Sequence, residues 1–241
     1  MNLKPKISIV LPCYNPKDGW EDTIINCYNA LLKQISTTFS TELMVVNDGS
    51  IKEINEDIIK NISSKCQDFS YIKIPQNRGK GFALRYAIAK CESDYIVYTD
   101  YDFPYEIDNI IETIYLLHRN KLNIVVGTRD LNYLKSLPLK RRIISAALSL
   151  ANHIFFPKMF IMDTQSGLKG FDQTGREVFM KTSINTYLFD TEFVNMASKI
   201  KGLRIGKINL QLRNGVSFSK MTNKVLREEL FNYFKLILKS N

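Results

Sequence analysis

The sequence is poor in the side chains that build small metal-bound or disulfide-linked domains. Its 241 residues contain two histidines and four cysteines. The cysteines are widely spaced, at Cys13, Cys27, Cys66 and Cys91. No pair has the short spacing of a zinc-binding motif, which argues against a cysteine-based metal centre. These cysteines therefore indicate free thiols and a reducing, cytoplasmic compartment.

Long hydrophobic runs are also missing. The longest apolar stretch covers residues 143–162, but Asn152, His153, Pro157 and Lys158 interrupt it. A membrane-spanning helix needs about 20 consecutive, mostly apolar residues, so this stretch predicts a buried or interfacial helix instead. The first residues are polar and lead straight into a strand-like run, so no secretory signal is expected.

Two common nucleotide-binding motifs are absent. The chain has neither the G-x-x-x-x-G-K-[ST] of a P-loop nor the G-x-G-x-x-G of a dinucleotide-binding unit. The stretch "LPCYNPKDG", which follows the first predicted strand, also lacks the glycine-rich phosphate loop expected of a sugar nucleotidyltransferase. Because no internal repeat or low-complexity linker is visible, we expect one domain over residues 1–220. A basic amphipathic helix is expected at residues 221–241.

Positive charge is plentiful but unevenly distributed. The chain has 33 Lys and Arg against 24 Asp and Glu, a net charge of +9. Residues 199–241 hold ten of these cations and only two Glu, and a second basic cluster lies at residues 140–142. Mixed with the apolar residues of the final segment, this charge favours an anionic partner surface, either membrane or nucleic acid. The final helix is expected either to pack onto the domain or to lie at a membrane surface. A solvated basic face is the simpler alternative, and no nucleic-acid recognition motif is visible.

Strand-like and helical patterns alternate along the first half of the chain. Short apolar runs predict strands at residues 7–11, 43–46, 71–74, 95–99 and 123–127. Apolar residues at helical spacing predict helices at residues 19–35, 51–66, 81–90 and 106–119. Continuous apolar strands separated by helices are typical of a mostly parallel sheet flanked by helices, so the predicted fold class is α/β.

Polar residues follow each of the five predicted strands. These loops are residues 12–15, 47–50, 77–81, 100–102 and 128–130. Open α/β sheets bind ligands beyond the carboxyl ends of their strands. The five loops together therefore predict one binding site at one edge of the sheet.

The clearest chemical signal in these loops is the D-x-D motif formed by Asp100 and Asp102, directly after an apolar strand. Carboxylates are hard oxygen ligands of the kind that Mg²⁺ and Mn²⁺ prefer, although D-x-D also occurs in ordinary acidic turns. Asp48, in "VVNDGS", is either a turn residue or an acceptor for hydrogen bonds from a nucleobase or ribose.

The stretch "NRGKGFALRYA" opens a predicted helix with two glycines and three basic side chains. Glycine allows a ligand to approach the backbone closely. The cations Arg78, Lys80 and Arg85 can attract phosphate near the start of the helix. This stretch therefore adds a possible phosphate-binding element to the predicted site.

These motifs, taken in order, resemble those of the family-2 glycosyltransferases of GT-A fold. The matching stretches are "SIVLPCYN", "VVNDGS", "NRGKGFALRYAI", "YTDYD" and "VVGTRD". In the second half, "RRIISAAL", "DTQSGLKGF" and "YLFDTEF" resemble the polyprenyl-phosphate branch, which includes the dolichyl-phosphate glucosyl- and mannosyltransferases. The resemblance covers residues 6 to about 215.

The resemblance implies a role for individual residues. The nucleotide and donor sugar would be bound by Pro12, Tyr14, Asn15, Asp48, Lys80, Arg85, Asp100, Gln165 and Ser166. The metal, Mg²⁺ or Mn²⁺, would be held by Asp100 and Asp102. The acceptor phosphate would be bound by Arg129, Arg141 and Ser145. The residues implied at the catalytic centre are Asp102, Arg129, Asp163, Asp190 and Glu192.

Two positions depart from the family pattern. Pro16 stands where an acidic residue commonly follows Tyr-Asn, which affects the expected nucleoside contacts. Tyr101 stands at the centre of the D-x-D, where a small residue is usual, and is expected to narrow the donor pocket.

The implied chemistry is an inverting sugar transfer to a polyprenyl or dolichyl phosphate at the cytoplasmic face of a membrane. A divalent cation would stabilise the charge that develops on the departing nucleotide. The second pKa of a phosphate monoester is about 6, so such an acceptor is largely a dianion near neutral pH and needs no general base. Asp190 and Glu192 are therefore expected to orient groups rather than to act as bases.

Two other functions are compatible with the sequence. A saccharide hydroxyl as acceptor would require a carboxylate base, and a degenerate family member would bind a nucleotide-sugar without turnover. UDP-glucose is the favoured donor, with GDP-mannose and UDP-N-acetylhexosamine as alternatives.

Overall fold

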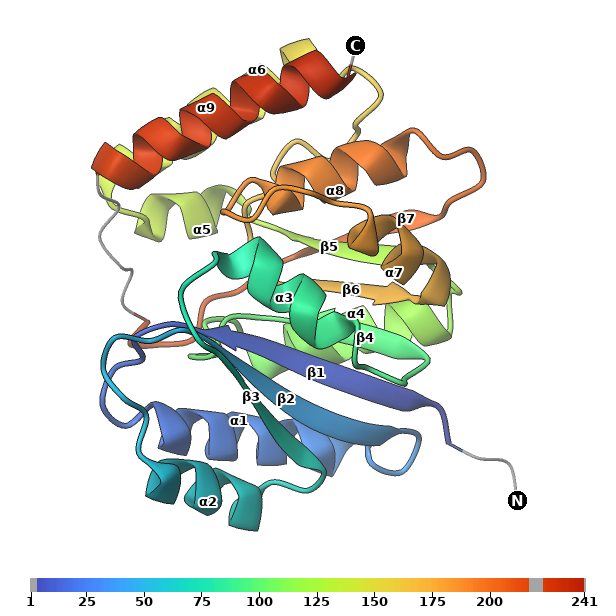
Figure 1. Cartoon of the computed structure of the whole chain (residues 1–241). Helices are drawn as coiled ribbons and strands as arrows, with labels where there is room; N and C mark the ends of the chain where they lie inside the picture. The colour runs from blue at the N-terminus through green and yellow to red at the C-terminus, as the bar shows by residue number, and fades with distance from the viewer. Residues whose placement is uncertain (1–3, 217–222, 241) are drawn as a thin grey trace.

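The computed structural model describes residues 4–216 and 223–240, and one seven-stranded sheet forms its centre (Figure 1). The strands are β1 (Lys6–Cys13), β2 (Ser40–Asp48), β3 (Phe69–Ile74), β4 (Tyr95–Tyr98), β5 (Ile124–Thr128), β6 (Lys169–Asp172) and β7 (Ile205–Asn209). Their order across the sheet is β3-β2-β1-β4-β6-β5-β7. Only β6 runs antiparallel to its neighbours among these strands, so the predicted mostly parallel α/β sheet is confirmed.

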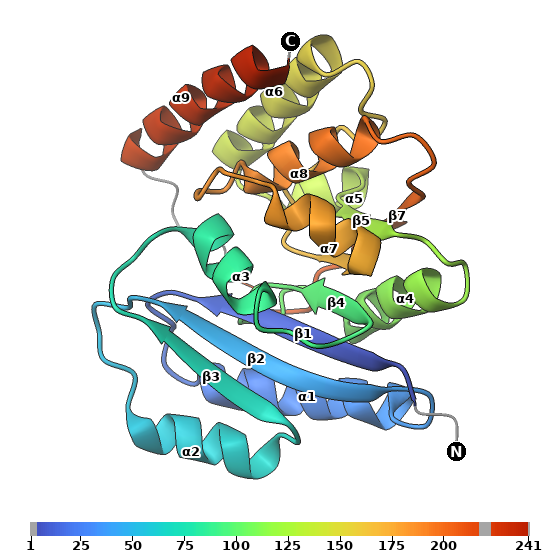
Figure 2. The same cartoon turned by 45° about the vertical axis from the view of Figure 1, so that its right-hand side comes forward.

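Helices connect the strands and cover both faces of the sheet. The helices of the described residues are α1 (Trp20–Ile35), α2 (Glu56–Lys65), α3 (Lys80–Ile88), α4 (Ile107–His118), α5 (Leu131–Ser136), α6 (Leu139–Phe155), α7 (Gln173–Met180), α8 (Phe189–Ser198) and α9 (Asn223–Ser240). Side chains alternate along β1, so Ile9 joins the core under α1, α2 and α4, whereas Val10 joins the core under α3, α7 and α8. Figure 2 shows α1 and α2 on one side of the sheet and α3, α7 and α8 on the other.

One predicted helix begins later than expected. The pattern indicates a helix over residues 51–66, but α2 begins at Glu56. The cause is Asn55, whose side chain accepts a hydrogen bond from the backbone N–H of Asp57 (2.9 Å) and so caps the first turn. Residues 49–55 therefore form a loop at the end of β2.

The carboxyl ends of β1 to β5 meet at one edge of the sheet, as the pattern of polar loops predicts. Because β6 is antiparallel to β4 and β5, it begins at this edge instead of ending there. The loop that leads into β6, residues 163–168, therefore lies with the loops that follow the other strands. This reversal brings the second half of the chain to the predicted site.

Helices α6 and α9 lie side by side on the outside of the molecule, beyond α8 (Figures 1 and 2). Tyr233 of α9 packs against Phe156, with 5.8 Å between ring centroids, and its hydroxyl donates a hydrogen bond to Asn152 Oδ1 (3.0 Å). The predicted boundary between residues 220 and 221 lies outside the described residues. Within residues 4–216 and 223–240, no helix combines the length and the apolar character needed to cross a bilayer.

Candidate active site

The loops after β1 and β2 are joined by two hydrogen bonds that involve Asn15. Its backbone N–H donates to Ser50 Oγ (2.9 Å), and its side-chain oxygen accepts from the backbone N–H of Ile51 (2.8 Å). The side chain of Tyr14 next to it is exposed, whereas Pro12 is buried in β1. The two loops in which a nucleoside site is predicted are thus fixed relative to each other. The Tyr14 ring is 42% exposed.

Asp48 holds the turn in front of α3. Its two carboxylate oxygens accept hydrogen bonds from the backbone N–H groups of Arg78 and Gly79, each 2.8 Å long. Gly79 has a φ of +97°, and a Cβ there would overlap the backbone of Asn185. The structure therefore gives Asp48 the turn role that its sequence context allows. A nucleoside would have to bond to the lone pairs of the Asp48 carboxylate that the amides of Arg78 and Gly79 leave free.

Lys80 directs its ammonium group at the D-x-D motif. Its Nζ lies 2.6 Å from Asp100 Oδ1, and the side chain of Lys80 is mostly buried. Burial lowers the pKa of Lys80, but attraction to Asp100 and Asp190 outweighs this effect and raises the pKa above its ordinary value. The other carboxylate oxygen of Asp100 lies against Gly167, where any Cβ would overlap it. This close approach explains why residue 167, in the loop that leads into β6, is a glycine.

Asp102 lies on a tight turn that Arg213 holds from the far end of the chain. The guanidinium donates from Nη2 to the carbonyl of Asp102 (2.8 Å) and from Nε to that of Phe103 (2.5 Å). Phe103 has a φ of +45°, which is rare for a residue other than glycine. Burial, and then the charge of Asp100, raise the pKa of Asp102. A divalent cation would relieve the repulsion between the two carboxylates.

The residues present fit a Mg²⁺ or Mn²⁺ ion that is shared with a substrate. Asp100 and Asp102 carry hard oxygen atoms on one loop. No group of three or more His, Cys, Asp or Glu side chains forms a metal site among residues 4–216 and 223–240. Magnesium is usually held by one or two carboxylates together with substrate phosphates, which matches this donor set.

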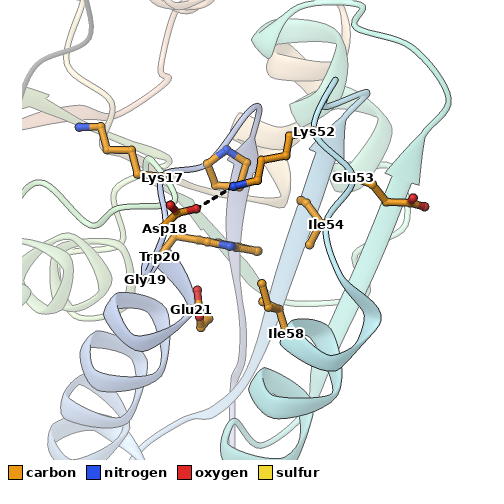
Figure 3. Close-up of a pocket in the computed structure, with 10 residues that line it drawn as sticks. Lys17, Asp18, Gly19, Trp20, Glu21, Lys52, Glu53, Ile54 and Ile58 are labelled. Atoms are coloured by element: carbon orange, nitrogen blue, oxygen red, sulfur yellow. Dashed lines mark hydrogen bonds and ion pairs between the residues drawn. The ribbon is translucent and has the colours of Figure 1, made fainter.

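Tyr101 turns its ring toward the start of α1. The ring meets Trp20 edge to face, with centroids 6.1 Å apart. Next to Trp20 lies a small pocket of about 120 Å³ between α1 and α2, with Lys17 and Ile58 in its wall (Figure 3). None of the predicted donor-binding residues lines this pocket. The Tyr101 ring therefore packs against Trp20, and the narrowing of the donor pocket stays a prediction.

Arg129, directly after β5, forms the centre of a second polar cluster. Its backbone N–H donates to Asp163 Oδ2 (2.7 Å), and its guanidinium forms a forked ion pair with the same carboxylate, 2.5 Å at the closest. Nη2 also donates to Ser145 Oγ on α6 (2.9 Å). Burial lowers the pKa of Arg129, but the hydrogen bonds and the charge of Asp163 outweigh this effect, so the pKa lies above its ordinary value. Arg141 lies one turn before Ser145 on the same helix, half-buried.

The polar groups of the loop of residues 163–168 form hydrogen bonds to neighbouring elements, and these bonds hold the loop in its conformation. Ser166 is buried, and its hydroxyl donates to the carbonyl of Gly127 (2.5 Å). Gln165 Nε2 donates to Thr191 Oγ1 on α8 (3.1 Å). The backbone N–H of Gly167 donates to the hydroxyl of Tyr105 (2.7 Å). The predicted sugar-binding residues of this loop thus lie at the site edge, with the Ser166 hydroxyl already engaged.

Asp190 belongs to a buried ion pair beneath the site. Its Oδ1 lies 2.9 Å from Lys169 Nζ and accepts a hydrogen bond from the hydroxyl of Tyr98 (2.5 Å). Lys169 is completely buried and also donates to the carbonyl of Ser166 (2.5 Å). Burial raises the pKa of Asp190 and lowers that of Lys169. Sequence reasoning missed both partners of Asp190, because nothing local marks a lysine in a short strand as buried.

Glu192 and Arg85 both form hydrogen bonds with the segment between α7 and α8. Glu192 accepts hydrogen bonds of 2.8 Å from the backbone N–H groups of Ser183 and Ile184 and from the hydroxyl of Ser183. Arg85 donates to the carbonyl of Ile184 (2.9 Å) and to Thr182 Oγ1 (3.1 Å). Both side chains therefore hold the segment between α7 and α8. The predicted contacts of Arg85 with the nucleotide and of Glu192 with the reaction centre stay predictions.

The sheet order and its edge of polar loops define the architecture of GT-A type glycosyltransferases. The structure resembles glucosyl-3-phosphoglycerate synthase from Mycobacterium tuberculosis, solved with Mn²⁺, UDP-glucose and phosphoglyceric acid. The TM-score is 0.65 at 18% identity, over 98% of this chain and 79% of the other. Mannosyl-3-phosphoglycerate synthase from Rubrobacter xylanophilus gives a TM-score of 0.68 at 15% identity, over 98% and 73% of the two chains. The predicted GT-A fold is confirmed.

The chain belongs to glycosyl transferase family 2, whose family model matches residues 8–188. It is 28% identical to a dolichyl-phosphate beta-glucosyltransferase from Dictyostelium discoideum, over 80% of this chain and 62% of the relative. A protein of the same name from Saccharomyces cerevisiae is 24% identical, over 89% of this chain and 69% of the relative. The chain thus spans about two thirds of the length of these relatives.

Proposed function

We propose that the protein is an inverting, metal-dependent hexosyltransferase that moves a sugar from a nucleotide-sugar to a polyprenyl or dolichyl phosphate. The observation that carries the proposal is the Arg129–Asp163–Ser145 cluster, which holds a guanidinium and a hydroxyl at the sheet edge that also bears Asp100 and Asp102. A guanidinium forks onto phosphate oxygens. The names of the dolichyl-phosphate beta-glucosyltransferase relatives support glucose as the sugar. We therefore propose UDP-glucose as the donor, with GDP-mannose and UDP-N-acetylhexosamine as alternatives.

On the donor side, Asp100 and Asp102 would hold the metal ion, which when bound would stabilise the charge on the departing diphosphate. Lys80 keeps the Asp100 carboxylate in place through the 2.6 Å ion pair. Lys80 also brings a second positive charge to the predicted diphosphate position. Arg213 fixes the backbone beneath Asp102. These contacts support a donor site that is arranged before the substrate binds.

On the acceptor side, the phosphate itself would be the nucleophile. The ordinary candidates for a base are occupied, since Asp190 pairs with Lys169 and Tyr98, and Glu192 accepts from backbone groups. A phosphate monoester dianion needs no such base. The arrangement therefore favours a phosphate acceptor over a sugar hydroxyl, whose proton a carboxylate would have to accept.

The proposal is tested first by a substrate screen. Purified protein is incubated with each nucleotide-sugar and Mg²⁺ or Mn²⁺, with and without a short-chain polyprenyl phosphate. We expect sugar transfer to the lipid phosphate that requires the metal and is fastest with UDP-glucose. Metal-dependent nucleotide binding without transfer to any phosphate would contradict the proposal and favour a saccharide acceptor or a non-catalytic role.

We expect Asp190→Asn and Glu192→Gln to leave the shape of the pH–rate profile unchanged. Loss of a true general base typically costs roughly 10²–10⁴-fold in rate and removes its pKa from the profile. Here each variant should lower kcat per folded molecule by less than about 10²-fold, because the carboxylates hold neighbouring groups. Asp190→Asn also leaves the buried Lys169 without its partner and should lower the Tm. A larger loss together with a vanished pKa would identify a base.

A membrane surface would supply such an acceptor, and α6 and α9 carry the side chains for it. On α6 the apolar residues Leu139, Ile143, Leu150 and Ile154 are each at least 60% exposed. Their spacing of four, seven and four places them on one helical face. On α9 the exposed apolar residues are Leu230, Phe231, Phe234 and Leu238. Exposed Arg142, Arg227 and Lys235 accompany them, which suits anionic lipid headgroups.

We expect the triple variant Phe231→Ser, Phe234→Ser, Leu238→Ser to bind anionic vesicles about tenfold or more weakly, since each buried apolar side chain contributes about 1.5–3 kcal/mol. These side chains point outward, so the fold should keep its Tm. Deleting the whole helix would instead expose the core residues that Tyr233 and Leu236 cover. Ile200→Ser, at an exposed apolar position beyond α8, serves as control. Unchanged sedimentation of the triple variant with vesicles would exclude this surface.

A further inference from the structure

The segment of residues 182–188, which we call the bridging segment, connects α7 to α8 and covers the start of α3. The backbone N–H of Gly81 donates to the carbonyl of Asn185 (2.7 Å). Added Cβ atoms at Gly79 and Gly81 would overlap the backbone carbonyls of Asn185 and Ile184. The contact between α3 and the bridging segment thus includes a direct backbone hydrogen bond, in addition to the hydrogen bonds that the Arg85 side chain of α3 donates to Thr182 and Ile184. Lys80, which pairs with Asp100, lies between these two glycines.

The bridging segment is held from the other side by α9. Glu229 accepts hydrogen bonds from the backbone N–H groups of Tyr187 (3.2 Å) and Leu188 (3.0 Å). Asn232, one turn further along, donates to Thr186 Oγ1 (2.9 Å). Glu229 is half-buried, and this burial raises the pKa of its carboxyl. These side chains lie on the inward-facing side of α9, beside the buried Tyr233 and Leu236 and opposite its exposed aromatic residues.

Glu229 also completes the N-terminus of α8. The residue at the cap position, Leu188, offers no side chain to the free backbone N–H groups there. A carboxylate at a helix N-terminus satisfies such donors and interacts favourably with the helix dipole. Glu229 performs this role from a different helix. Asp190, which pairs with the buried Lys169, lies in the first turn of α8. The contact with Glu229 therefore also helps to hold Asp190 in position.

We infer that Glu229 and Asn232 are positioning residues for the donor site, and that α9 sets the geometry of Lys80 and Asp100 through the bridging segment. The inference rests on the proposed function for its meaning in catalysis, although the contacts stand independently of it. The path runs from α9 to residues 186–188, from Asn185 to α3 through the backbone N–H of Gly81 and beside it through Arg85, and from Lys80 to Asp100. A shift of about 1 Å in a positioning element can cost about 10²-fold in rate.

The test compares Glu229→Gln and Asn232→Ala with Glu228→Gln. Glu228 is the neighbouring exposed glutamate on α9, so its change removes the same charge from the same helix. Three quantities are measured for each full-length variant: hydrogen exchange of residues 182–190 and of α3, the affinity for UDP with Mn²⁺, and binding to anionic vesicles. Hydrogen exchange and nucleotide affinity require no assumption about the acceptor.

For Glu229→Gln we expect about tenfold faster exchange in residues 182–190 and at the start of α3, because two backbone donors lose a charged acceptor. UDP affinity should fall about fivefold or more, and vesicle binding should stay unchanged. Asn232→Ala should act in the same direction, and Glu228→Gln should match wild type. A merely structural role would lower the folded fraction without changing the affinity of the folded protein, so an unchanged UDP affinity overturns the inference.

The failure of the inference and the failure of the proposed function give different results. If wild-type protein transfers no sugar to any phosphate but Glu229→Gln still weakens UDP binding and exposes α3, the proposed function fails and the inference holds. If wild type transfers sugar and Glu229→Gln retains both UDP affinity and protection of α3, the inference fails and the proposed function holds.

Discussion

Asp102→Asn should reduce sugar transfer by roughly 10²–10³-fold or more, because it removes half of the carboxylate pair that would hold the metal. The substitution keeps the size of the side chain, and Arg213 fixes the surrounding turn through backbone carbonyls that the change does not touch. Because Asp102 is half-buried near the charge of Asp100, a neutral amide at this position should relieve the repulsion between the two side chains. The Tm should therefore stay level or rise while activity collapses.

The measurement is kcat at a series of Mn²⁺ concentrations, with Asp108→Asn as control. Asp108 is exposed in the first turn of α4 and carries the same charge a short distance along the chain. We expect the control to follow wild type at every metal concentration. If Asp102→Asn kept wild-type activity at a metal concentration that saturates wild type, the assignment of this carboxylate as a ligand would be wrong.

Arg129→Lys should reduce kcat/KM for the lipid phosphate by about 10²-fold while leaving the KM for the nucleotide-sugar nearly unchanged. Arg129 makes a forked pair with Asp163 and reaches Ser145 with the same guanidinium. Lysine keeps the charge but presents a single point donor, so it can satisfy Asp163 or a phosphate but not both in this geometry. Arg129→Ala is a poorer test, because an unpaired buried Asp163 typically costs about 3–5 kcal/mol of stability.

Two further variants separate acceptor binding from folding. Ser145→Ala removes one hydrogen bond from Arg129 and should produce a smaller loss in the same parameter. Arg119 is an exposed arginine at the end of α4, so Arg119→Lys should change neither kcat/KM for the lipid phosphate nor the KM for the nucleotide-sugar. If Arg129→Lys raised the KM for the nucleotide-sugar and left the lipid phosphate unaffected, the cluster would belong to the donor site.

The parts of the fold that follow local rules were predictable from the sequence. Five strands and four helices of the first half follow from apolar periodicity, and the D-x-D motif from its place after a strand. β6 was not predictable in this way, since its four residues include Lys169 and Gly170 and show no alternation. Lys169 can lie in the sheet because Asp190, on α8, forms an ion pair with it. A sequence pattern does not report such a partner.

The site shows the same limit. The sequence context of Asp48 allowed either a turn role or a nucleoside contact, but it did not indicate that two backbone N–H groups would bond to its oxygens. Arg213 carried no local signal, because its partners are carbonyl groups more than a hundred residues earlier. The sequence indicates which loops meet, since strand direction decides this. It does not indicate which polar groups are used up in holding those loops.

The reversed strand β6 also determines the distance between β4 and β5. It hydrogen-bonds on one side to β4, which leads into the D-x-D motif, and on the other to β5, which leads into Arg129. Neighbouring strands lie about 4.8 Å apart, so β4 and β5 are separated by roughly 10 Å. In the proposed reaction, β4 leads to the departing diphosphate and β5 leads to the incoming phosphate. The distance of roughly 10 Å therefore separates the strands that lead to these two groups. One inserted strand would thus set the span that a hexose must bridge during transfer.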